Sequence, residues 1–109
     1  MITEQERDES LQWLLDFADE VGRSYGGMKV SETAIKVAEA KGIRESDSGA
    51  VEAKRAYART TDDYIRAVET YGECCAEYTT LATLKQYHHA RLDAFRTQQS
   101  DRRGLDTRF

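Results

Sequence analysis

The chain of 109 residues contains no proline and no asparagine, and its two cysteines stand side by side as Cys74 and Cys75. Without asparagine no N-glycosylation site can exist. One adjacent cysteine pair also cannot form the disulfide framework that stabilises many small secreted domains. The common residues Ala, Glu, Arg, Lys, Gln and Leu are good helix formers. This composition predicts an all-α protein in a reducing, cytoplasmic location.

Long hydrophobic runs are missing as well. No stretch approaches the roughly 18 apolar residues of a membrane span. The opening residues MITEQERDESLQW are acidic where a signal peptide needs a basic segment followed by an apolar run. We therefore expect a soluble, unprocessed protein without a membrane partner. At this length we expect a single helical domain that covers residues 1–109.

The net charge of −4 is distributed unevenly along the chain. Counting Lys and Arg against Asp and Glu gives −5 for residues 1–24, +2 for 25–60, −4 for 61–84 and +3 for 85–109. Mild net acidity argues against a protein that mainly coats nucleic acid. The acidic front and the basic tail instead predict two partner-binding surfaces, formed by Asp16, Asp19, Glu20, Arg91, Arg96, Arg102 and Arg103.

The spacing of apolar residues predicts helices at about residues 3–23, 28–41, 47–58 and 61–101. We expect Gly26 and Gly27 to break the first helix from the second, and Gly42 to cap the end of the second. Thr61, followed by two aspartates, is typical of an N-cap at the start of the last helix.

The last predicted helix carries a heptad pattern, because tyrosines recur every seven residues from Tyr57 to Tyr78. A helix of this length spans roughly 60 Å, whereas a compact domain of this size is roughly 35 Å across. Either the helix breaks at Gly72, or a second copy buries its seam in a coiled-coil-like homodimer. We expect the homodimer, with a seam formed by Tyr64, Tyr71, Cys74, Tyr78, Leu81, His88, Leu92 and Phe95.

The cysteine pair and the pair His88–His89 do not predict a shared metal site. On one helix Cys74 and His88 lie about 21 Å apart, and zinc needs its ligands within about 2.0–2.3 Å. We expect all four side chains to be packing or interface residues, with no catalytic residue, no cofactor and no metal. A metal site between subunits, a redox role for the cysteines and a pH-dependent histidine interface are alternatives.

Residues 38–103 resemble a group of small, uncharacterised helical proteins encoded in the early regions of tailed phages and prophages. These proteins share an AYA segment, a short break before a tyrosine and a closing pattern of arginines and aromatic residues. The matching residues here are Ala56, Tyr57, Ala58, Tyr64, Ala90, Arg91, Leu92, Phe95, Arg96 and Arg103. The resemblance implies a phage-encoded accessory protein in the cytoplasm of a bacterial host, and it implies no activity.

No catalytic motif is present, so we expect a non-enzymatic protein that binds a host or phage protein. Such a protein could inhibit a bacterial defence system, as an anti-CRISPR or another anti-defence protein. One alternative is a nucleic-acid-binding accessory of phage recombination that uses its C-terminal arginines. A second alternative is a sponge for a nucleotide or another small ligand, with a site between helices near His88 or His89.

Overall fold

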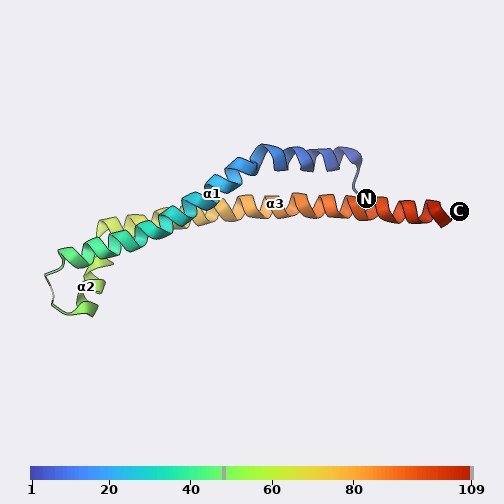
Figure 1. The fold of residues 1–109 in the computed structure, drawn as a ribbon. Coiled ribbons are helices and arrows are strands. Elements are labelled where there is room, and N and C mark those ends of the chain that lie inside the picture. The colour runs from blue at the N-terminus through green and yellow to red at the C-terminus, as the bar shows by residue number, and fades with distance from the viewer. Residues whose placement is uncertain (48, 109) are drawn as a thin grey trace. The chain divides into compact units, whose positions relative to one another are not determined.

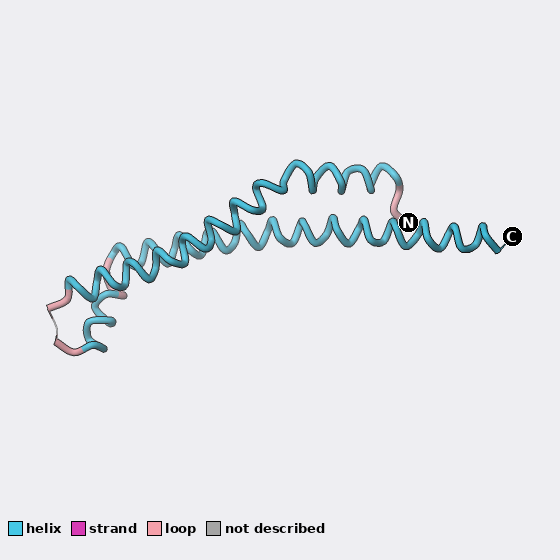
Figure 2. Tube along the Cα trace, viewed as in Figure 1, coloured by secondary structure: helices cyan, strands magenta, loops and turns pink. Residues whose placement is uncertain are grey.

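The structure, a computed structural model, describes residues 1–47 and 49–108. This part of the chain forms three helices, α1 (Glu4–Glu45), α2 (Val51–Ala58) and α3 (Asp62–Arg108), and contains no strand (Figure 1). Figure 2 shows that the segments between these helices are short. The predicted all-α fold with a long C-terminal helix is therefore confirmed. Two compact units are distinguished: unit 1 contains Met1–Val21 and the part of α3 from Thr80 onward, and unit 2 contains Gly22–Thr79.

Side-chain caps define where the two long helices begin. At the start of α1 the Thr3 hydroxyl accepts a hydrogen bond from the Glu6 backbone N–H at 3.1 Å, and the Glu6 carboxylate accepts one from the Thr3 N–H at 3.5 Å. This reciprocal pair is a capping box. At the start of α3 the Thr61 hydroxyl accepts a hydrogen bond from the Tyr64 N–H at 3.3 Å. Both starts agree with the sequence prediction.

The predicted break at Gly26 and Gly27 is wrong, because α1 is one helix of 42 residues. The separate helices expected at about 3–23 and 28–41 are therefore a single element. Ser24 and Ser31 are buried on either side of the glycines, and the helix keeps both against the rest of unit 2. Each glycine costs a helix only about 1 kcal/mol relative to alanine, so burial on both sides outweighs the penalty.

Two other predicted boundaries also differ from the structure. α2 begins at Val51 rather than near residue 47, because Ala50 has an extended backbone (φ −83°, ψ 134°) and no side chain caps the helix. α3 passes through Gly72 without a break and continues to Arg108, seven residues beyond the predicted end at 101. The prediction of a single domain stays a prediction.

The heptad seam of α3 is covered within one chain. Its members in unit 1 (Leu81, His88, Leu92 and Phe95) are buried, and those in unit 2 (Tyr64, Tyr71, Cys74 and Tyr78) are half-buried. The covering residues belong to α1: Trp13 stacks on His88 in unit 1, and Tyr25 meets Tyr78 in unit 2 with ring centroids 5.4 Å apart. The seam therefore needs no second copy for its burial, which removes the reason for assigning it to a dimer contact. Dimerisation itself stays a prediction.

One heptad series of α1 consists mainly of small residues. Its positions Ser10, Phe17, Ser24, Ser31 and Ala38 recur every seven residues, and all are buried or half-buried. In unit 2 these small residues are combined with the large tyrosines of α3. A wide side chain on one helix and a narrow one on the other fill the space between closely packed helices.

Candidate functional site

Unit 1 contains the one histidine that the sequence assigned to the seam, and the structure places it beside a serine. Ser10 on α1 is fully buried, His88 on α3 is 9% exposed, and the Ser10 Oγ and His88 Nδ1 atoms lie 2.9 Å apart. The Trp13 ring stacks on the imidazole at 4.7 Å between centroids, and Tyr87 meets it edge-on at 5.0 Å. A polar pair is thus enclosed by aromatic rings.

The environment of His88 favours the neutral imidazole. Burial lowers the pKa of His88 below its usual value, and the nearby Arg91 guanidinium lowers it further. A neutral imidazole beside a serine hydroxyl could act as a general base. However, the Ser10 side chain has no exposed surface, so a substrate cannot reach its hydroxyl in this arrangement. The pair is placed to orient the two helices rather than to react.

Arg91 lies three residues after His88 on α3 and forms further polar contacts with α1. Its side chain is 12% exposed, and its guanidinium lies 3.2 Å from the Glu6 carboxylate and 3.4 Å from that of Glu9. The same group reaches the Tyr87 hydroxyl at 3.5 Å, while its Nε is buried without a hydrogen-bond partner. Arg91 was expected to be an exposed partner-binding residue, and that expected exposure is wrong. Its charge is already paired within the chain.

The cysteine pair lies in unit 2. Cys74 and Cys75 are both free and half-buried. The Tyr71 hydroxyl contacts the Cys75 side chain, and this contact raises the pKa of Tyr71. Across residues 1–47 and 49–108, no three His, Cys, Asp or Glu side chains are grouped so that they could hold a metal ion.

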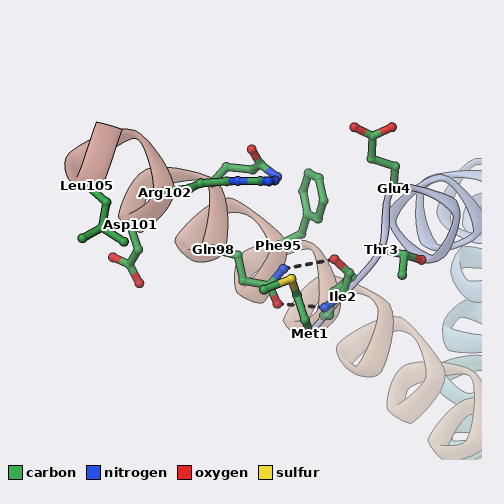
Figure 3. A pocket seen from close by; sticks show the side chains of 10 residues that line it. Met1, Ile2, Thr3, Glu4, Phe95, Gln98, Asp101, Arg102 and Leu105 are labelled. Carbon is green, nitrogen blue, oxygen red and sulfur yellow. Dashed lines mark hydrogen bonds between the residues drawn. The ribbon is translucent and has the colours of Figure 1, made fainter. Parts of the chain in front are cut away.

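A groove in unit 1 brings the first residues of the chain against the C-terminal part of α3. Gln98 holds this segment: its Oε1 accepts a hydrogen bond from the Ile2 N–H at 2.8 Å, and its Nε2 donates one to the Ile2 carbonyl at 3.0 Å (Figure 3). The groove measures about 530 Å³, and its lining residues include Met1, Ile2, Phe95, Arg102 and Leu105.

The groove combines apolar surface with charge. Figure 3 shows Phe95, Gln98 and Arg102 along α3 with Met1 and Ile2 beside them, and Leu105 lies on the last turn drawn. Leu105 is 54% exposed, so apolar surface is open to solvent at this end of the groove. The guanidinium of Arg102 supplies a cation beside it. An apolar groove with a few placed polar groups is the usual form of a ligand site.

The other predicted partner-binding residues take different places. Arg96 and Arg103 line a second, smaller groove of about 340 Å³ with Phe95 and Gln99. Arg96 also lies 3.7 Å from the Asp93 carboxylate in an exposed pair. The acidic residues Asp16, Asp19 and Glu20 are exposed on α1. The structure therefore brings Arg96, Arg102 and Arg103 around Phe95 and separates them from Arg91.

Several interactions were missed in the sequence. The Ser10–His88 contact and the hydrogen bonds between Ile2 and Gln98 join residues about 80 to 100 positions apart, and no local pattern marks them. The buried serines of α1 did carry a signal. Ser10, Ser24 and Ser31 share the same heptad position, which is a spacing that predicts one buried face.

Comparison of the chain with protein-family models, with curated proteins and with solved structures finds no match in any of the three. Within the residues described, none of the helices has the length and apolar character needed to cross a membrane.

Proposed function

We propose that this chain is a non-enzymatic, phage-encoded accessory protein that works by binding another protein. The observation that carries the proposal is the groove of unit 1, where Met1, Ile2 and Leu105 offer apolar surface beside Arg102. The burial of the Ser10–His88 pair supports a function without catalysis, because that pair is closed to substrates. The resemblance of residues 38–103 to small phage proteins supports the origin.

The chemistry of the groove defines the kind of partner. An apolar side chain of the partner would cover Met1 and Leu105, and a neighbouring carboxylate would pair with Arg102. The carboxylates of Glu4 and Asp101 also line the groove, so the ligand we propose is a largely apolar segment of a host protein that carries a single carboxylate for Arg102. Inhibition of a bacterial defence system fits this mode of action, because occupying one surface of a target is enough to block it.

The proposal is tested by affinity capture from bacterial lysate, with and without nuclease, for the wild type and for Leu105→Glu. We expect a stoichiometric protein that resists nuclease and is lost with Leu105→Glu, because a buried carboxylate would be unpaired in the contact. The matched control is Val51→Glu, a similarly exposed position on α2 with 64% of its surface exposed. Capture that is equal for all three proteins would contradict the proposal.

A second candidate function is binding to nucleic acid, which the arrangement of Arg96, Arg102 and Arg103 around Phe95 favours. Phosphate contacts make affinity fall steeply with salt. Recovery that depends on nucleic acid, survives about 150 mM salt and is lost when these arginines are replaced by glutamine would establish this function. It would also displace the protein-binding proposal.

A further inference from the structure

Gln98 holds the start of the chain by its main chain rather than by a side chain. The Gln98 side-chain amide accepts a hydrogen bond from the Ile2 N–H at 2.8 Å and donates one to the Ile2 carbonyl at 3.0 Å (Figure 3). An amide side chain carries an acceptor and a donor, so it satisfies both main-chain groups of one residue at once. These two groups point to the same side in an extended backbone, as in a β-ladder, and residues 1–3 lie outside α1. The groove of unit 1 thus includes an extended segment that one side chain fixes in place.

Residues 1–2 do not owe their position to helix α1. The capping box begins the helix after them, so the helix is complete without them. The Met1 side chain is fully exposed, and the Ile2 side chain is half-buried. A chain end of this kind is poorly ordered unless a contact fixes it. The two hydrogen bonds from Gln98 supply such a contact.

The fixed segment lies beside the two residues of α3 that the proposed partner would contact. Gln98, Arg102 and Leu105 follow one another at intervals of four and three residues, so they share one face of α3. Gln98 therefore places Met1 and Ile2 against the face that carries the cation and the exposed apolar side chain, and all five residues line one groove. A chain start released from Gln98 would take two apolar side chains away from this groove.

We propose that Gln98 is the positioning residue of the partner-binding groove: it docks residues 1–2, and the groove binds its partner while they are docked. This inference rests on the proposed function and adds the step that completes its site. A segment that is already docked spares the partner the entropic cost of ordering it. The apparent affinity is then the affinity of the docked state multiplied by the fraction of chains that are docked.

The docking step is tested first without any partner. The backbone nuclear Overhauser effect between ¹H and ¹⁵N of Ile2 reports whether its N–H is ordered. We expect an ordered Ile2 in the wild type and a mobile one in Gln98→Ala, which has neither the acceptor nor the donor. Gln86→Ala is the matched control, because Gln86 is an exposed glutamine on the same helix and does not line the groove. The urea midpoint should be nearly the same for all three proteins, since residues 1–2 lie outside the helices.

Affinity for the captured protein then tests what docking does. We expect Gln98→Ala to bind it about tenfold more weakly, as a chain that is docked for about a tenth of the time would. Gln86→Ala should keep the wild-type affinity. Ile2→Gln separates positioning from direct contact, because it keeps the main-chain groups and removes the apolar side chain. Since Gln98 acts through residues 1–2, Gln98→Ala should lower the affinity less in the Ile2→Gln background than in the wild type.

The outcomes that overturn the proposal differ from those that overturn the proposed function. The proposal is wrong if Ile2 is equally ordered in the wild type and in Gln98→Ala, or mobile in both. It is also wrong if Gln98→Ala binds the captured protein like the wild type, or if the losses from Gln98→Ala and Ile2→Gln are additive. Capture of no protein by the wild type would contradict the proposed function, whereas the docking of residues 1–2 on Gln98 is decided by the NMR measurement alone.

Discussion

His88 shows how a single residue links the packing of unit 1 to solution conditions. Its imidazole lies between the rings of Trp13 and Tyr87, with Ser10 at its Nδ1. The charged group nearest to it is the guanidinium of Arg91 on α3. The carboxylates of Glu6 and Glu9 lie beyond that guanidinium and pair with it. Protonation of His88 would place a second cation next to Arg91 with little solvent to screen it.

We predict that the free energy of unfolding falls as the pH is lowered through the ordinary range of histidine. The pKa of His88 is lowered in the folded state, by burial first and by Arg91 second. At a pH below the unfolded pKa of about 6.5, the unfolded chain binds a proton that the folded chain resists, so stability rises with pH. The contribution of neutral His88 to the free energy of unfolding is complete above the unfolded pKa, and it decreases as the pH falls below that value. Urea unfolding between about pH 8 and pH 5.5 measures the effect.

The neighbouring histidine provides the control for this titration. His89 is exposed, so His89→Gln should keep the pH dependence, whereas His88→Gln should lose it. An unfolding free energy that is flat across the range for the wild type would contradict the prediction.

For single residues, the sequence indicates which side chains are buried better than it indicates which side chains they contact. The heptad pattern correctly marked His88 as a packed residue, since periodicity reports which side of a helix is buried. Arg91 was expected to be exposed, yet its side chain is largely covered. Glu6 and Glu9 cover it, and their position follows from how α1 meets α3 in unit 1, which no local pattern encodes.

Between helices, Gly42 and Gly72 have opposite packing environments. A Cβ at Gly42 of α1 would lie 2.6 Å from the Cα and 2.7 Å from the Cβ of Ala58, the last residue of α2. Neither of those atoms can move without moving the backbone. A Cβ at Gly72 of α3 would meet nothing within 4 Å. One glycine is thus required by the contact between α1 and α2, and the other is not.

We therefore predict opposite effects for the same substitution. Gly42→Ala should lower the free energy of unfolding by about 1–3 kcal/mol, as overpacking does. Gly72→Ala should raise it by about 1 kcal/mol through helix propensity. Urea unfolding of the two variants beside the wild type measures both signs. Stabilisation by Gly42→Ala would show that α2 does not pack where the structure places it, and a loss of stability for Gly72→Ala would show that a contact outside the chain requires that glycine.

The helices themselves could be predicted from sequence only in part. The heptad pattern of α3 predicts that helix because it uses large residues, whereas the α1 series that contains Ser10, Ser24, Ser31 and Ala38 uses mainly small residues, which resemble exposed positions. Gly26 and Gly27 have a low helix propensity and so predict a break, but the buried residues Ser24 and Ser31 lie on the same helix on either side of them. Gly42 was expected to cap a helix, but its close neighbour Ala58 comes from another element.

Few apolar side chains are buried for a chain of this length. Among the described residues, the buried hydrophobic side chains are Ala38, Ala58, Leu81, Leu92 and Phe95, while thirteen large hydrophobic side chains are exposed. Folded chains with so little apolar burial have a small margin of stability. A second copy that covered some of these exposed side chains would add apolar burial that one chain lacks.

Association and stability should therefore be linked across the whole protein. If the folded chain is a dimer and the unfolded chain a monomer, mass action stabilises the fold as concentration rises. We predict that the thermal midpoint increases by about 2–4 °C for each tenfold rise in protein concentration, given the unfolding entropy of a chain of this size. Scanning calorimetry at several concentrations measures the shift. A wild-type midpoint that stays constant over the same range of concentrations would mean that each copy folds and unfolds alone.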